Sequence, residues 1–166
     1  GTGAAPGEDW PTRLAGASGW QVVNAGIPGD TAAAGRERIA ALLDAHRPAL
    51  VIVGIGGNDF LRRRPQSAVK EDLRSIVVAI RAAGAQPVLL AVPELSLLGA
   101  MTRRPADAPI YAELGEEEAV PVIDGIFAEV LGRAEWRADP IHPNAEGYRR
   151  MAKGIADGLR AAGLLR

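Results

Sequence analysis

The sequence lacks several features that would mark whole classes of protein. It has no cysteine, so disulfides, thiolate metal sites and cysteine nucleophiles are excluded. No apolar run reaches the length that spans a membrane. The formal net charge is -1 over 166 residues, which gives no electrostatic case for a nucleic-acid partner. The basic run Arg62-Arg63-Arg64 is too short to change that and is typical of a solvated loop.

Nucleotide-binding signatures and a secretion signal are missing as well. The chain contains neither GxGxxG nor GK[ST], so a dinucleotide or phosphate binder is disfavoured. The opening stretch GTGAAPGEDW has no basic and no apolar segment, and we do not expect it to be a signal peptide. A chain without cysteine suits both the cytosol and the periplasm, so composition leaves the compartment open.

What the sequence does contain is an alternation of short apolar runs and helical patterns. Its length fits a single domain over residues 1–166. Strands that alternate with helices pair in parallel, so we expect an α/β protein with a doubly wound, mostly parallel sheet. The expected strands are Trp20–Asn24, Leu50–Ile55, Pro87–Val92 and Val120–Asp124.

The expected helices lie between these runs. Asp30 or Thr31 is suited to cap a helix that ends near His46. Ser67 is suited to cap the next helix, which Gly84 closes. Further helices are expected near residues 110–118, directly after the fourth strand, and over residues 144–162, with Gly163 as the last C-cap.

The loops after the strands are where function is expected, because ligands of such sheets bind beyond the carboxyl ends of the strands. The first three expected strands end in GIPGD, GGND and PELS. The motif DPIHPNAEGY lies in the last loop before the final helix. The long stretch 93–107 is irregular, and such loops are often functional.

Asp139 and His142 form the first candidate pair. They are three residues apart, and the prolines around His142 stiffen the backbone so that both side chains can face one cleft. A carboxylate that accepts the Nδ1 proton would leave Nε2 as a base. The alternative is that Asn144 caps the last helix and that Asp139 and His142 lie in the preceding loop without a catalytic role. His46, at the expected end of a helix, is interpreted as structural.

Two glycine-rich turns supply candidate donors. Asn58 in GGND can present an amide N–H, and Gly29 in GIPGD can present a backbone N–H. Such donors stabilise a tetrahedral oxyanion. The alternatives are an ordinary strand-to-helix turn at Asn58 and a helix cap at Asp30. Together, the donors and the Asp–His pair form an acyl-transfer set without its nucleophile.

These residues resemble the SGNH (GDSL-type) hydrolases, in particular the bacterial arylesterase, acyl-thioesterase and lysophospholipase branch. VVNAGIPGDT is similar to the block that carries the oxyanion glycine, here Gly29. VGIGGNDFLR is similar to the block whose asparagine is the second oxyanion donor, here Asn58. DPIHPNAEGY is similar to the block in which an aspartate, here Asp139, orients the histidine base, here His142.

The resemblance also reveals a departure, because the family's first block, a strand that runs into Gly-Asp-Ser, has no counterpart here. Ser18 precedes the first expected strand, whereas Ser67 and Ser75 belong to an expected helix. Ser96 alone follows a strand and stays a remote candidate. We therefore expect an N-terminally incomplete domain whose nucleophile lies upstream of Gly1, or a strand supplied by another molecule.

The resemblance implies a flavodoxin-like three-layer α/β/α sandwich that lacks its usual first, central strand. It implies a serine esterase for aryl, short-chain acyl or lysophospholipid (thio)esters, without cofactor or metal, with a small-molecule substrate and with a periplasmic or secreted location slightly favoured. This chain alone is expected to be inactive. A non-catalytic module that binds acylated ligands and a carbohydrate O-acetyl esterase are the alternatives. Leu95, Leu97, Leu98 and Met101 are expected to line an acyl site or to pack into the core.

Overall fold

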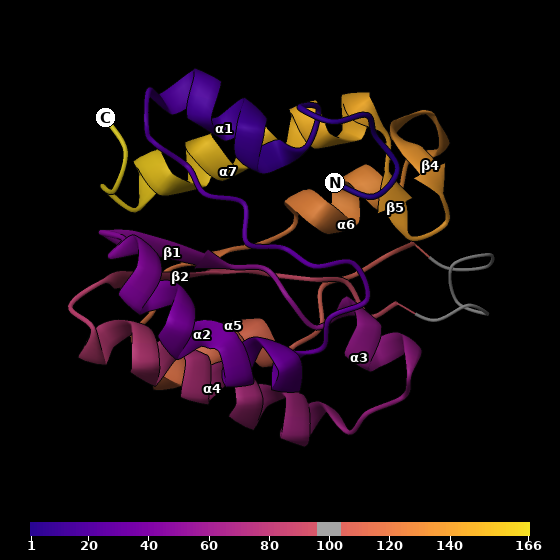
Figure 1. Cartoon of the computed structure of the whole chain (residues 1–166). Coiled ribbons are helices and arrows are strands. Elements are labelled where there is room, and N and C mark those ends of the chain that lie inside the picture. Colours follow the sequence, from indigo (N-terminus) through magenta and orange to yellow (C-terminus); the bar gives the residue numbers. More distant parts are fainter. Residues whose placement is uncertain (96–103) are drawn as a thin grey trace. The chain divides into compact units, whose positions relative to one another are not determined.

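The computed structural model describes residues 1–95 and 104–166 (Figure 1). Its contacts group into two compact units. Unit 1 comprises residues 1–28, 104–106 and 125–166, and unit 2 comprises residues 29–95 and 107–124. The expectation of a single domain over residues 1–166 stays a prediction.

Unit 2 contains a parallel three-stranded sheet in the order β1-β2-β3. The strands are β1 (Leu50–Val53), β2 (Gln86–Leu90) and β3 (Val122–Ile123). The register pairs Val53 with Leu89 and Leu90 with Ile123. The predicted α/β fold with a mostly parallel sheet is confirmed, and three of the four expected strands form where the apolar runs lie.

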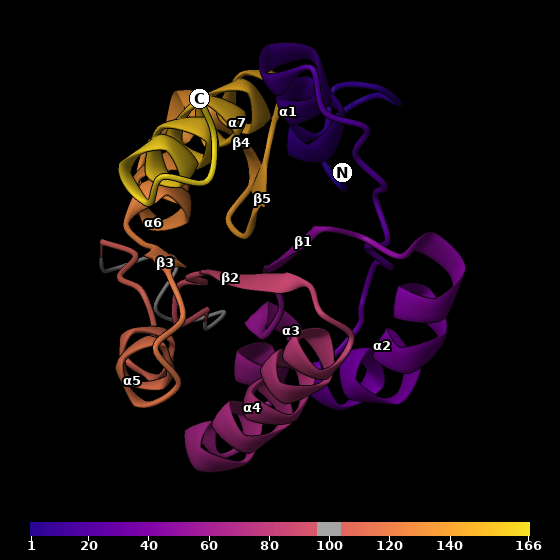
Figure 2. The same cartoon turned by 90° about the vertical axis from the view of Figure 1, so that its left-hand side faces the viewer.

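The helices of unit 2 lie together on one side of its strands (Figure 2). Val88 to Leu90 of β2 and the apolar stripe of α4 (Gln66–Ala82) are buried, which is the core that this packing forms. At the surface, Lys70 and Arg74 of α4 form ion pairs with acidic side chains of α5 (Ile110–Glu117) and with Glu118 just after it. These helices are α2 (Ala32–His46), α3 (Gly57–Leu61), α4 (Gln66–Ala82) and α5 (Ile110–Glu117).

Unit 1 packs α1 (Trp10–Ser18) along α7 (Ala145–Ala161), the two lying side by side in Figures 1 and 2. Its other elements are α6 (Ile126–Leu131), a short 3-10 helix (Ala134–Trp136) and an antiparallel pair, β4 (Arg137–Asp139) and β5 (His142–Pro143). The predicted cap at Asn144 is confirmed, since its side chain accepts the N–H of Gly147. Within the described residues, no helix combines the length and apolar character that crossing a membrane requires.

The predicted strand Trp20–Asn24 is wrong. No strand forms there, and the Trp20 N–H is bonded to the Ser18 hydroxyl instead. Val23 and Ile27 are 52% and 53% exposed. The physical reason is that a strand is stabilised by its neighbours, and no described strand pairs with this segment.

One helix start agrees with one of its two predicted caps, and another differs from the prediction. Thr31, not Asp30, caps α2, because the Asp30 carboxylate is bonded to Arg38. Ser67 does not cap α4, which begins one residue earlier, after Pro65. Pro65 is the N-cap and has a non-helical backbone, with φ −56° and ψ 130°, so Ser67 falls inside the first turn. Gly84 follows the end of α4 with a φ of 79°, as predicted.

Candidate active site

In unit 1 the structure brings Asp139 and His142 together. They face each other across the β4–β5 pair, and the His142 Nδ1 lies 2.7 Å from the Asp139 Oδ2. The other carboxylate oxygen accepts the backbone N–H groups of Ile141 and His142, at 2.8 and 2.9 Å. This predicted pair is therefore a hydrogen-bonded couple, built within four residues of the chain.

The electrostatics keep the Asp139 carboxylate ionised. Partial burial raises its pKa, but the bonds from the Ile141 N–H and from the His142 ring outweigh that effect, so the pKa of Asp139 lies below its ordinary value. The side chains of His142 and Asp139 are 34% and 45% exposed. A carboxylate held ionised beside Nδ1 favours the tautomer in which Nε2 can accept a proton.

The segment around the pair is anchored to the start of α7. The Asn144 side chain donates to the Glu135 carbonyl at 2.9 Å, and its backbone N–H donates to the Trp136 carbonyl. A Cβ on Gly147 would lie 2.1 Å from that same carbonyl, so the close approach requires glycine. The Trp136 ring is flanked by the guanidinium groups of Arg133 and Arg150, at 4.9 and 4.6 Å.

In unit 2 the structure brings the Gly29 turn and Asn58 together. The Asn58 Nδ2 donates to the Asp30 carbonyl at 3.0 Å, next to Gly29. Gly29 is exposed and has a φ of 84°, a conformation that favours glycine. Asn58 lies in the first turn of α3. Among the described residues, the Asn58 amide donates only to the Asp30 carbonyl, so its second hydrogen is available for the predicted donor role.

The start of the GGND motif is held by a residue that sequence reasoning missed. The Tyr111 hydroxyl, on α5, donates to the Ile55 carbonyl at 2.6 Å. Gly56 has a φ of 134°, and a Cβ there would lie 2.1 Å from that hydroxyl. Burial, followed by the charges of Asp59 and Asp107, raises the pKa of Tyr111 well above its ordinary value. No local pattern identifies Tyr111, because 56 residues separate it from Ile55.

A buried ion network lies directly behind Asn58. Asp59 is 0% exposed and forms an ion pair with Arg64, which also pairs with the buried Asp72 at 2.9 Å. The prediction of a solvated loop at Arg62-Arg63-Arg64 is thus wrong for Arg64, although Arg62 and Arg63 are exposed. Arg64 departs from that prediction because two buried carboxylates require a cation.

The serines offer no nucleophile with an evident role among the described residues. The Ser18 hydroxyl donates to the Leu14 carbonyl and accepts the Trp20 N–H. Ser75 lies within α4 and bonds the Glu71 carbonyl, and Ser67 lies in the first turn of α4. Ser96 lies outside the described residues.

The predicted acyl-site leucines are only partly covered. Leu95 lies beside the GGND motif, since a Cβ on Gly57 would meet its side chain at 3.1 Å. Leu97, Leu98 and Met101 lie outside the described residues. The described ends of the 93–107 stretch are joined by an isolated antiparallel bridge between Pro93 and Asp107.

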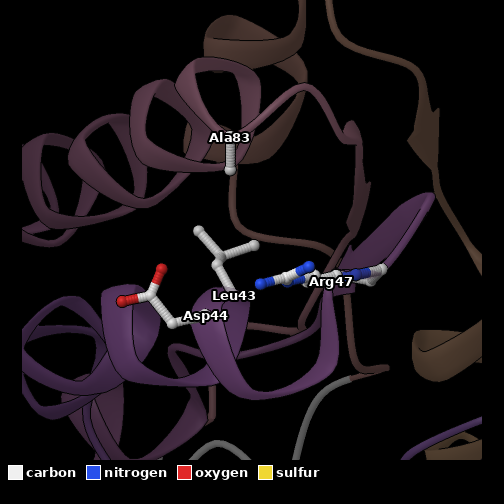
Figure 3. A pocket seen from close by; sticks show the side chains of 5 residues that line it. Leu43, Asp44, Arg47 and Ala83 are labelled. Carbon is white, nitrogen blue, oxygen red and sulfur yellow. The ribbon is translucent and has the colours of Figure 1, made fainter.

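A hollow of about 430 Å³ lies elsewhere in unit 2 (Figure 3). Leu43, Asp44 and Arg47 from the end of α2 line it, together with Pro48 and Ala83. These residues precede β1 and β2, so the hollow is at the amino ends of the strands, away from Gly29 and Asn58. His46, the last residue of α2, lies on this side as well. Among the described residues, no cluster of acidic and histidine side chains could hold a metal ion.

The four predicted site residues thus form two pairs. Asp139 and His142 lie in unit 1, whereas Gly29 and Asn58 lie in unit 2. Each pair is held together by a hydrogen bond, and the roles of its members stay predictions. The convergence of all four on one substrate stays a prediction.

Comparison with known proteins identifies relatives along most of the chain. The model of the GDSL-like lipase/acylhydrolase family matches residues 1–150. Thioesterase 1/protease 1/lysophospholipase L1 of Escherichia coli is 36% identical over 158 residues, which cover 91% of this chain and 74% of that protein. The arylesterase of Vibrio mimicus is 31% identical over 141 residues, covering 83% of this chain and 69% of that protein.

A solved structure supports the same assignment. The crystal structure of TesA superposes with a TM-score of 0.81 at 28% identity, covering 96% of this chain and 92% of that one. The match extends along both units, and the relatives' names describe the hydrolysis of esters and thioesters. The chain therefore belongs to the GDSL-like lipase/acylhydrolase family and is a carboxylic ester hydrolase of the SGNH type.

Proposed function

We propose that this chain supplies the base, His142, and the oxyanion donors of an esterase or thioesterase that works by a Ser-His-Asp mechanism. The observation that carries the proposal is the 2.7 Å contact between the His142 Nδ1 and the Asp139 Oδ2. A carboxylate in this position orients the imidazole and stabilises the imidazolium that forms when Nε2 takes a proton.

The remaining steps follow from the two pairs. His142 removes the proton of a serine hydroxyl as the serine attacks the substrate carbonyl, and an oxyanion develops on the carbonyl oxygen. The Gly29 N–H and the free hydrogen of the Asn58 amide donate to that oxyanion. His142 then returns the proton to the leaving alcohol or thiol, and water hydrolyses the acyl-enzyme by the same steps in reverse order.

The nucleophile, in this proposal, comes from a segment that ends in Gly-Asp-Ser and is not among the 166 residues. The edge strand β1 supports it. Among the described strands, β1 pairs only with β2, so its second edge has backbone groups that an added strand would satisfy. Either an upstream segment or a partner molecule would meet this requirement.

The substrate class is proposed from the relatives. Their names include a thioesterase, a lysophospholipase and an arylesterase. We therefore propose aryl, short-chain acyl or lysophospholipid esters as substrates. Leu95, beside Gly57, offers an apolar contact for the acyl chain.

The test compares turnover of p-nitrophenyl acetate and butyrate by two proteins: this chain, and the chain preceded by a strand ending in Gly-Asp-Ser. We expect the first to be silent and the second to be active. Because His142 is the base, H142A should lower kcat of the active protein by about a thousandfold or more. H46A is the matched control, since His46 is the only other histidine, and it should retain activity.

Three outcomes would argue against the proposal. Turnover by the 166-residue chain that H142A abolishes would place the nucleophile within these residues, and Ser96 would be tested next. Turnover that H142A leaves unchanged would remove His142 from the mechanism. Tight binding of a non-hydrolysable acyl analogue without turnover by either protein would indicate a non-catalytic module.

A further inference from the structure

The segment 29–32 is bound to the segment 58–62 by three hydrogen bonds. The Asn58 side chain donates to the Asp30 carbonyl at 3.0 Å, and the Arg62 guanidinium donates to the Gly29 carbonyl at 3.3 Å. The backbone N–H of Ala32 donates to the Asp59 carboxylate at 2.9 Å. These bonds join parts of the chain that are 27 to 33 residues apart.

Of these bonds, the one to Asp59 is the most firmly held. The exposed fraction of Asp59 is 0%, and one of its oxygens accepts from Ala32 while the other accepts from Arg64. Arg64 is fixed in turn by Asp72, whose second oxygen binds Arg36 at 2.8 Å. Charge-assisted bonds of this kind are shorter and stronger than neutral ones, so the carboxylate has little freedom to move.

The position of Asp59 in the sequence explains how its bond to the Ala32 N–H affects the two proposed donors. Asp59 directly follows Asn58, and Ala32 is the first residue of the helix that the Gly29 turn enters. The carboxylate thus fixes the spacing between the two proposed oxyanion donors. Such donors are effective only when they lie about 2.7–3.1 Å from the developing charge.

We propose that Asp59 is a positioning residue, which sets the Gly29 turn against Asn58 through the Ala32 N–H. The proposal rests on the oxyanion role of Gly29 and Asn58 given above. Asp59 itself does not contact substrate. It acts by holding two donors that come from different loops.

The test measures hydrogen exchange of the Asn58 side-chain amide by NMR in the full chain, without substrate. The rate is divided by that of the Leu89 backbone amide, a buried group of β2 that bonds the Pro121 carbonyl, so that a general loss of stability cancels. D59A removes the acceptor of the Ala32 N–H, and we expect the ratio to rise by about tenfold. D72A is the matched control: it also deprives Arg64 of one carboxylate but leaves the Ala32 bond intact.

A second variant keeps the test decisive if D59A fails to fold. A32P removes the N–H donor while Asp59 stays in place. Proline is tolerated at the first position of a helix, and Thr31 before it is already extended, with φ −101° and ψ 166°. A145P makes the same change at the first position of α7, where Asn144 is likewise extended, and serves as its control.

The proposal is supported if D59A or A32P raises the Asn58 ratio while D72A and A145P leave it within about threefold of the unchanged protein. It is overturned if the ratio stays constant in both test variants, or if D72A raises it as much as D59A. Because no substrate is present, a failure of the proposed esterase activity would not affect this result. In the active protein described above, D59A should also lower kcat by about tenfold with little change in KM.

Discussion

The two halves of the candidate site are built in opposite ways. The three bonds that the Asp139 carboxylate accepts from Ile141 and His142 span two or three residues, and the Asp139 and His142 side chains are partly exposed. The Gly29 and Asn58 donors are joined by bonds that span 27 to 33 residues, next to a carboxylate that is 0% exposed. The proposed base is thus set by local backbone geometry, whereas the proposed donors depend on the packing of unit 2.

This difference has a chemical reason. A proton-transferring group needs contact with its substrate and with solvent, and an exposed pair gives little stability. Oxyanion donors need fixed positions, which a buried and fully bonded network provides. Substitutions in the two regions should therefore differ in what they change: activity at the hairpin and stability at the donor turn.

The largest effect is expected from removing the buried carboxylate. D59A leaves Arg64 with one partner and the Ala32 N–H with none, so unfolding free energy should fall by about 3–5 kcal/mol. D139A removes a partly exposed carboxylate and should cost about 1 kcal/mol or less. Urea unfolding followed by circular dichroism measures both. Equal losses would show that the two regions do not differ in the way proposed.

The next largest effect should come from Gly56. G56A puts a Cβ 2.1 Å from the Tyr111 hydroxyl at a φ of 134°, so we expect a loss of about 2–4 kcal/mol. G84A is its control, because Gly84 also has a positive φ but nothing within 4 Å. It should lose about 1 kcal/mol through backbone strain alone. Thermal unfolding of both variants decides whether the space beside Tyr111 matters.

A smaller effect is expected at high pH in unit 1. Burial, then the charges of Asp9 and Asp139, raises the pKa of Tyr148 from 10.0 to about 12. The folded state disfavours ionisation of the Tyr148 phenol. The contribution of Tyr148 to the free energy of unfolding is therefore complete below pH 10 and is lost as the pH rises to about 12.

Y148F does not ionise and measures this contribution directly. Across this pH range, the free energy of unfolding of Y148F should fall by about 1–2 kcal/mol less than that of the unchanged protein. All three tryptophans lie in unit 1, so their fluorescence follows this unit. Parallel curves for the two proteins would contradict the assignment.

The smallest effect should appear at acid pH. Because the pKa of Asp139 is lowered in the folded state, its stabilising contribution is present above the ordinary carboxyl pKa of 3.8 and is lost as the pH falls through the lower, folded value. D139N lacks this titration. The difference in Tm between D139N and the unchanged protein should therefore shrink between neutral pH and strongly acid pH. A difference that is constant with pH would show that the carboxylate charge is not involved.

Much of the fold was predictable because its signals are local. The continuous apolar run 50–55 produced β1, the run 87–92 produced β2, and the cap at Asn144 began α7. The segment 20–24, in which Trp20, Val22 and Val23 are apolar, forms no strand. An apolar pattern indicates which residues favour an extended backbone, but a strand also needs a neighbouring strand to pair with. No described strand pairs with residues 20–24.

The sequence by itself determined the Asp–His pair, the α/β alternation and the glycines of the two turns proposed to carry the donors. Spacing and backbone stiffness act over a few residues, so these features can be read from the chain directly. Only the tertiary structure decided that Tyr111 bonds the Ile55 carbonyl, that Asp59 bonds the Ala32 N–H and that Arg64 is drawn to two buried carboxylates. These contacts join residues brought together by burial, and the cost of burying an unpaired polar group, not any local pattern, selects the partner.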